Sequence, residues 1–123
     1  MADIGFVRDI SNNDEGLVKA QVRKIQEFSP EATIKTIRPT KKDISKFISS
    51  LHEDRVLVTE KVMLGFNLKS VIDNMLAILN TGSKIYCIDE GMLFTPDNEF
   101  LRLFGDIDSR ARYIREVFGE IGN

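Results

Sequence analysis

The sequence predicts an α/β fold: a single domain with a mostly parallel sheet of about four strands, flanking helices and a long C-terminal helix. The main observation is the stretch over residues 54–91, in which two apolar runs, residues 55–59 and 85–88, enclose an amphipathic run of helical period. A strand, a helix and a strand in that order make the two strands parallel neighbours. Both apolar runs are almost unbroken, which is typical of strands that are covered on both faces.

Length and composition allow one domain and exclude several classes of protein. The 123 residues, 42% of them hydrophobic, suffice for one core of ordinary size. Seventeen basic and nineteen acidic residues give a net charge of −2, unlike the strongly basic balance of a free-standing DNA-binding module. The single cysteine excludes an internal disulfide, and neither a signal peptide nor a membrane-spanning run is visible. We therefore expect a cytoplasmic protein.

The first elements in chain order are a strand and a helix. The short apolar run over residues 4–7 predicts a strand, and the polar loop after it, which reaches Gly16, lies where α/β proteins usually bind ligands. The helix that follows is ended by Ser29 and Pro30. Its predicted inner face consists of Leu17, Val18, Val22, Ile25 and Phe28.

A second strand and helix come next. The alternation over residues 33–37 predicts a strand near an edge of the sheet. Thr40 and Asp43 have the spacing of a capping box with an aspartate variant, so they begin a helix that runs to about Leu51. The inner face of this helix is predicted to be Ile44, Phe47, Ile48 and Leu51.

Cations gather around the start of this second helix. They are Arg38, Lys41, Lys42 and Lys46. Two interpretations are open: a nucleic-acid-binding surface that contacts phosphate, or an ordinary solvated helix face. His52, at the end of the helix, is interpreted as a partner of the C-terminal helix dipole rather than as a ligand.

No cofactor or metal is expected. Gly65 and Gly82 lie too far apart for a phosphate-binding loop, and no Gly-Lys-Ser/Thr follows a strand. One histidine and one cysteine, Cys87 on a predicted buried strand, do not provide a metal site, and Cys87 is interpreted as a small core residue. Asp89 and Glu90 at a strand end suggest an acid–base pair, but no group that would position them is identifiable.

The central helix and the last helix complete the chain. Asn67 is the predicted N-cap of the central helix and Gly82 its left-handed stop, whereas residues 89–94 are predicted to form a loop. The last helix begins after Thr95 and Pro96 and runs from about Phe100 nearly to the end.

The last helix carries two apolar stripes. Spacings of three and four residues produce a heptad seam: Phe104, Ile107, Ala111, Ile114, Phe118 and Ile121. The second stripe consists of Leu101, Leu103, Tyr113 and Val117. Because one small sheet covers only one stripe, we interpret the seam as the interface of a homodimer; the alternative is a wide core-facing stripe.

Several short motifs occur in a characteristic order. They are Gly5-Phe6-Val7-Arg8, residues 54–58, Leu64-Gly65, residues 88–91 and Ile114-Arg115-Glu116. In this order and spacing the chain resembles the catalytic domain of the resolvase/invertase serine recombinases, whose opening strand ends in Tyr-x-Arg-x-Ser and whose signature is Asp-Arg-Leu-Gly-Arg. The resemblance covers residues 1–123 as one catalytic-type domain, and we expect no DNA-reading domain because the chain stops at Asn123.

The resemblance implies a nucleophilic serine that attacks a DNA phosphate and arginines that stabilise the charge on the phosphoryl oxygens. Carried over by position, the first arginine is Arg8, whereas the serine position falls on Ile10, with Ser11 one residue later. Lys41 stands about where another family arginine is expected, and it keeps the charge without the bidentate fork.

The remaining charged positions of the family are replaced. Val62, Met63 and Phe66 stand where the signature carries its aspartate and two arginines, and the Glu-Arg pair of the long helix falls on Arg110-Ala111. This favours a catalytically degenerate domain that acts by self-association or as a partner of an active recombinase or another DNA-processing complex.

Two alternatives remain at this stage. The first is an active, divergent serine recombinase that uses Ser11 as nucleophile with Arg8 and Lys41 as its phosphate clamp. The second is a nucleic-acid-binding module that uses the four cations around the second helix. In the favoured interpretation DNA binding is weak if it occurs at all, and no membrane is involved.

Overall fold

The computed structural model describes residues 1–9 and 15–97. In chain order the elements are β1 (Asp3–Arg8), α1 (Glu15–Phe28), β2 (Thr33–Ile37), α2 (Lys41–Ser49), β3 (Arg55–Val58), the 3₁₀ helix η1 (Lys61–Leu64), α3 (Leu68–Asn80), β4 (Lys84–Cys87) and β5 (Met92–Phe94). Ser11, the predicted long C-terminal helix and its seam residues lie outside the described residues. None of the described helices is both long and apolar enough to cross a membrane.

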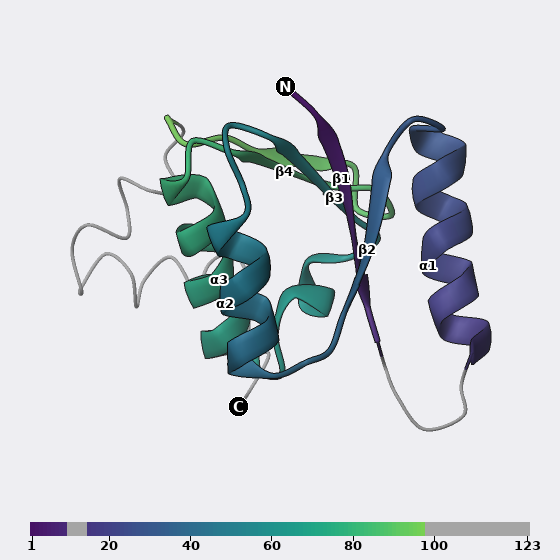
Figure 1. The fold of residues 1–123 in the computed structure, drawn as a ribbon, viewed down its shortest axis with the longest axis horizontal. Helices are drawn as coiled ribbons and strands as arrows, with labels where there is room; N and C mark the ends of the chain where they lie inside the picture. The colour runs from purple at the N-terminus through teal and green to yellow at the C-terminus, as the bar shows by residue number, and fades with distance from the viewer. Residues whose placement is uncertain (10–14, 98–123) are drawn as a thin grey trace.

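One five-stranded sheet with the order β2-β1-β3-β4-β5 organises the fold. The first four strands are parallel neighbours, and β5 pairs with β4 antiparallel. Helix α1 lies on one face of the sheet, and α2 and α3 lie on the other (Figure 1). The predicted α/β fold, the parallel β3–α3–β4 unit and the edge position of β2 are confirmed.

The strand β5 was predicted as part of a loop, and this prediction was wrong. The strand has only three residues, too few for an alternating pattern to stand out in the sequence. Gly91 has a φ of 62°, a left-handed conformation that allows the tight turn back from β4. Phe94 is then buried in the core on the α2–α3 side, which holds the short strand in place.

The core has two parts, one on each face of the sheet. The larger part lies between the sheet and α2 with α3, and the smaller centres on Val7, Ile25 and Leu57 beneath α1. Leu17 and Phe28 were predicted to face inward, but both are exposed, by 46% and 41%. Phe28, at the end of α1, stacks on Tyr86 with ring centroids 4.8 Å apart instead of entering the core.

The predicted helix boundaries are confirmed at three positions. The Thr40 hydroxyl accepts a hydrogen bond from the Asp43 backbone N–H at 3.1 Å, and the Asn67 side chain accepts one from the Ser70 N–H at 2.8 Å. Gly82 follows α3 with a φ of 84°. These caps supply partners for backbone groups that have none within the helix, so both helices begin where the sequence predicts.

Candidate functional site

The carboxyl end of β1 is fixed by a glutamine that sequence reasoning missed. The Arg8 backbone N–H donates to Gln21 Oε1 at 3.0 Å, and Gln21 Nε2 donates back to the Arg8 carbonyl at 3.0 Å. Gln21, on α1, is only 4% exposed. Its position among the inward-facing residues of the predicted helix was the available signal, because a buried amide needs partners. Gln21 therefore fixes the backbone of Arg8, and with it the point from which the Arg8 side chain extends.

The Arg8 side chain contacts the loop that links η1 to α3. Its Nη1 donates to the Gly65 carbonyl oxygen at 3.0 Å, and the guanidinium carbon lies 5.2 Å from the centre of the Phe66 ring. Its Nε is buried and has no hydrogen-bond partner. Arg8, the arginine that the sequence placed in the candidate catalytic set, is thus engaged within the protein by a carbonyl and an aromatic face.

Close packing at Gly65 brings that loop within reach of Arg8. A Cβ at this position would lie 2.5 Å from both Ser70 Oγ and the Val71 backbone nitrogen. The Gly65 backbone is extended, with φ −170°, so the requirement is for space rather than for a left-handed conformation. The Ser70 hydroxyl oxygen also accepts from the Phe66 and Asn67 backbone N–H groups, at 2.8 and 3.0 Å.

Two lysines near this edge pair with carboxylates. Lys24 Nζ lies 2.8 Å from Asp89 Oδ2, and the Lys61 ammonium contacts the Glu90 carboxylate. The Lys61 backbone N–H also donates to Glu90 Oε1 at 2.8 Å. Asp89 and Glu90, considered as an acid–base pair, therefore each have a lysine partner.

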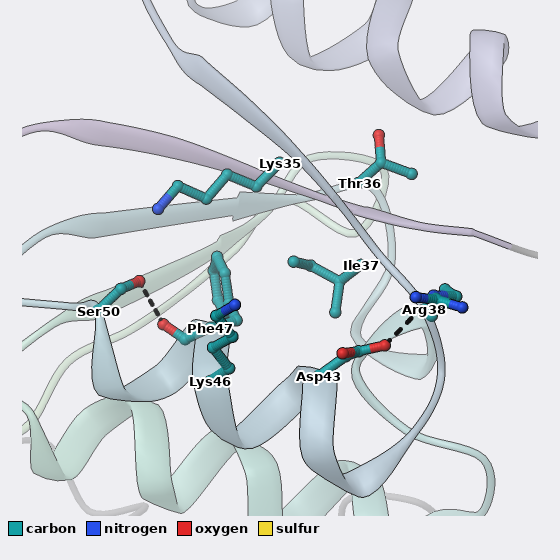
Figure 2. Close-up of a pocket in the computed structure, with 8 residues that line it drawn as sticks. All are labelled: Lys35, Thr36, Ile37, Arg38, Asp43, Lys46, Phe47 and Ser50. Atoms are coloured by element: carbon teal, nitrogen blue, oxygen red, sulfur yellow. Dashed lines mark hydrogen bonds and ion pairs between the residues drawn. The ribbon is translucent and has the colours of Figure 1, made fainter.

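A second region, the β2–α2 groove, lies between strand β2 and helix α2 and has a volume of about 480 Å³. Its lining residues are Lys35, Thr36, Ile37, Arg38, Asp43, Lys46, Phe47 and Ser50 (Figure 2). Arg38 Nε lies 3.4 Å from Asp43 Oδ2, a loose contact at a side chain that is mostly exposed. The groove thus combines three cations with one carboxylate over an apolar floor.

The structure divides the four predicted cations into two pairs. Arg38 and Lys46 line the β2–α2 groove, whereas Lys41 and Lys42 are exposed on the first turn of α2 and do not line it. Lys35 joins the first pair from β2, and sequence reasoning missed it. The signal was the alternation of β2, which places Lys35 on the opposite face from Ile34.

Arg8 and Arg38 end up at the same edge of the sheet. The parallel strands β1 and β2 place Arg8 opposite Ile37, so Arg38 follows one residue beyond that pair. The two arginines nevertheless have different partners: Arg8 donates to the Gly65 carbonyl oxygen, and Arg38 lies near the Asp43 carboxylate.

Comparison with solved structures identifies the fold of this chain. A resolvase family site-specific recombinase from Streptococcus pneumoniae matches with a TM-score of 0.64 over 99% of this chain and 95% of that chain, at 13% sequence identity. The fold is resolvase-like. No family model matches the chain, and a search of curated proteins finds no match either. At this identity the likeness establishes the fold and no more.

Val62, Met63 and Phe66 were predicted to stand at the family's signature positions, and of these three Phe66 lies against Arg8. Val62 and Phe66 are exposed by 51% and 58%, and Met63 packs partly buried against the core. These positions contribute no charge. Ser11 and Ile10 lie outside the described residues, so the relation of the candidate nucleophile to Arg8 stays a prediction.

The opposite edge of the resolvase-like sheet holds a stronger ion pair. Arg55 Nε and Nη2 donate to the two carboxylate oxygens of Asp3 at 2.9 and 2.8 Å, and the Ser29 hydroxyl donates to the same carboxylate at 2.7 Å. These hydrogen bonds, that of Arg55 first, hold the pKa of Asp3 below its ordinary value, although burial opposes them. The pair joins the starts of β1 and β3.

The described residues contain neither a cluster of metal-ligating side chains nor an exposed thiol. They contain no group of three or more histidine, cysteine, aspartate or glutamate side chains that could hold a metal ion. Cys87 is fully buried, and burial, aided by the nearby Glu90 charge, raises the pKa of its thiol to about 12. The thiol is therefore protonated at neutral pH and is a core residue, as predicted.

Proposed function

We propose that this chain is a catalytically degenerate recombinase-like domain that acts by association. It forms a homodimer through its C-terminal helix, or it joins an active recombinase or another DNA-processing protein. The observation that carries the proposal is the engagement of Arg8 by the Gly65 carbonyl and the Phe66 ring. Part of the donor capacity of this guanidinium is therefore already used within the protein, which leaves fewer N–H groups for a phosphate.

The physical argument concerns the charge that phosphoryl transfer requires. Catalysis of this reaction depends on positive charge fixed around the phosphoryl oxygens. Here Lys24 and Lys61 pair with carboxylates, and Val62 and Phe66 are apolar. A serine at position 11 would therefore gain little fixed positive charge from these four residues.

The first test is a search for covalent chemistry. The chain is incubated with supercoiled DNA and the mixture is resolved by denaturing electrophoresis, with Ser11→Ala as the matched variant. We expect no protein–DNA adduct from either protein, because the phosphate clamp is incomplete. An adduct that is formed by the wild-type chain and abolished by Ser11→Ala would contradict the proposal and support an active recombinase that uses Arg8, Ser11 and Lys41.

The second test addresses the proposed dimer interface. The seam consists of Phe104, Ile107, Ala111, Ile114, Phe118 and Ile121. Burying one such phenylalanine or isoleucine contributes about 1.5–3 kcal/mol, so several pairs across a two-fold axis offset the cost of association. Ile114→Asp would bring two like charges together near the middle of the seam. We expect a dimer for the wild-type chain and a folded monomer for Ile114→Asp in sedimentation equilibrium.

The matched control for this test is Ser109→Asp. It adds the same charge at a position outside both apolar stripes of the helix, and it should leave the dimer intact. A wild-type chain that stays monomeric at about 100 µM would refute homodimerisation, because several buried phenylalanine and isoleucine pairs should hold a dimer at that concentration. Unfolding of Ile114→Asp would indicate that the seam belongs to the core of one chain.

A further inference from the structure

Among the described residues, no strand pairs with the outer side of strand β2. It is the edge strand of the described sheet, paired with β1 alone. The Ile37 carbonyl accepts from the Asp9 N–H at 2.9 Å, so the peptide groups of Ile37 face β1. In a parallel pair of strands, the backbone N–H and C=O groups of every second residue point toward the same neighbouring strand. Because those of Ile37 point toward β1, those of Ile34 and Thr36 point away from β1, to the outer side of β2. Such an edge is a template for a further strand.

The groove beside this edge carries positive charge. Figure 2 shows Lys35 and Arg38 toward opposite ends of the β2–α2 groove, with Ile37 and Phe47 between them. Lys46 adds a third cation from α2, and among the described lining residues Asp43 is the one carboxylate. The described lining residues therefore carry three cations against one carboxylate, an excess of two positive charges, in a chain whose net charge is −2. The occupant of the groove is therefore expected to be acidic.

We propose that the β2–α2 groove binds an extended acidic segment of a partner protein, which pairs with β2 as a sixth strand of the sheet. Alternate side chains of that segment face α2, where carboxylates meet Lys35, Arg38 and Lys46. The side chains between them lie beside Ile34 on the other face, where apolar residues fit. This binding requires neither DNA chemistry nor the C-terminal seam.

An extended peptide fits this groove better than a nucleic acid strand. Single-stranded nucleic acids stack their bases on exposed aromatic faces, but Phe47, the aromatic residue of the lining, is only 3% exposed. The outward peptide groups of Ile34 and Thr36, in contrast, match the spacing of donors and acceptors on another strand. Lys41 and Lys42, which would extend a phosphate-binding surface, do not line the groove.

The probe for this proposal is a fluorescein-labelled peptide of about nine residues that alternates glutamate and valine, long enough to span the five residues of β2. Binding to the full chain is followed by anisotropy, and the Ile34 and Thr36 amides are followed by ¹⁵N NMR. We expect saturable binding below about 1 mM that shifts both amides and slows their hydrogen exchange. The absence of binding at that concentration would overturn the proposal.

Two charge-reversed variants locate the binding surface. Lys46→Glu, in the groove, should weaken binding about tenfold, because an attraction becomes a repulsion. Lys42→Glu makes the same change on the same helix outside the groove, and it should alter affinity less than about twofold. Equal effects of the two variants would indicate attraction by overall charge and would overturn the assignment to the groove.

Two further changes test the strand pairing. Thr36→Pro removes an outward N–H without removing a bond to β1, and it should abolish binding in a folded protein. A probe that is N-methylated at every second residue tests the same hydrogen bonds without altering the protein, and it should also fail to bind. Undiminished binding of the methylated probe would overturn strand addition. A fifteen-nucleotide oligothymidine that displaces the peptide, and whose binding is lost in Lys46→Glu, would instead assign the groove to nucleic acid.

Discussion

Arg8 and Arg38 lie at the same edge of the sheet but in opposite surroundings. Arg8 is partly buried, donates to the Gly65 carbonyl and lies against the Phe66 ring. The Arg38 side chain is 75% exposed and has only a loose contact with Asp43. The comparison shows that residue type alone does not decide whether a cation can bind a ligand. Contacts within the protein already engage Arg8, whereas most of the Arg38 side chain is open to solvent.

The energetic consequences of the two settings differ as well. A hydrogen bond from a charged group in a partly buried setting contributes about 1.5–3 kcal/mol, whereas an exposed ion pair contributes at most about 1 kcal/mol. Arg8 should therefore matter for stability and little for binding. Arg38 should matter for binding and little for stability.

The largest expected effect comes from the residue that brings the loop to Arg8. In Gly65→Ala the new Cβ would meet Ser70 Oγ and the Val71 nitrogen at 2.5 Å. Because backbone atoms cannot move aside cheaply, the free energy of unfolding should fall by about 2–3 kcal/mol, as measured by denaturant titration. The control is Gly91→Ala, where no atom lies within 4 Å and only the positive φ is strained, at about 1 kcal/mol. Equal losses would show that the loop adjusts and that Arg8 is held loosely.

The direct comparison of the two arginines should give an intermediate effect. Arg8→Met removes the hydrogen bond to Gly65 and the contact with Phe66, so the free energy of unfolding should fall by about 1–2 kcal/mol. Arg38→Met should change it by less than about 0.5 kcal/mol. Chemical denaturation of both variants provides the measurement. A stable Arg8→Met protein would return Arg8 to the set of residues available for phosphate.

The smallest expected effect is on the pH dependence of the free energy of unfolding. It separates Arg55, which is bound to a carboxylate, from Arg8, which is bound to a backbone carbonyl. Asp3→Asn weakens the pair with Arg55 and should lower the free energy of unfolding by about 1 kcal/mol at pH 7. The lowered pKa of Asp3 means that this stabilisation is fully present above the ordinary value of 3.8 and is lost as the pH falls through the folded-state value. The difference between wild type and Asp3→Asn should therefore shrink as the pH falls below 3.8.

The deficit of Arg8→Met serves as the reference for this pH series. It should keep its size between pH 7 and pH 3, because the Gly65 carbonyl that accepts from Arg8 does not titrate. Denaturant titrations of the variants across the pH range provide the measurement. Parallel pH dependence of the two deficits would indicate that a carboxylate also supports Arg8.

Much of the fold was predictable because it depends on local pattern. The helical spacing of α3 and the apolar runs of β3 and β4 predicted the central parallel unit. Thr40, Asn67 and Gly82 marked helix boundaries that the structure confirms. Strand β5 was missed because three residues are too few for a pattern, and its pairing with β4 depends on the turn at Gly91.

The candidate site divides in the same way. The sequence alone identified Arg8, Arg38 and Lys46 as cations of interest, because residue type and position along an element can be read directly. It also predicted that Val62 and Phe66, which carry no charge, stand at the signature positions. What surrounds each cation was decided only by the tertiary structure. The hydrogen bond from Arg8 to Gly65 joins residues 57 positions apart, and the β2–α2 groove exists only because α2 packs back beside β2. Contacts between residues so far apart in the sequence depend on how whole helices and strands pack, which no local sequence pattern specifies.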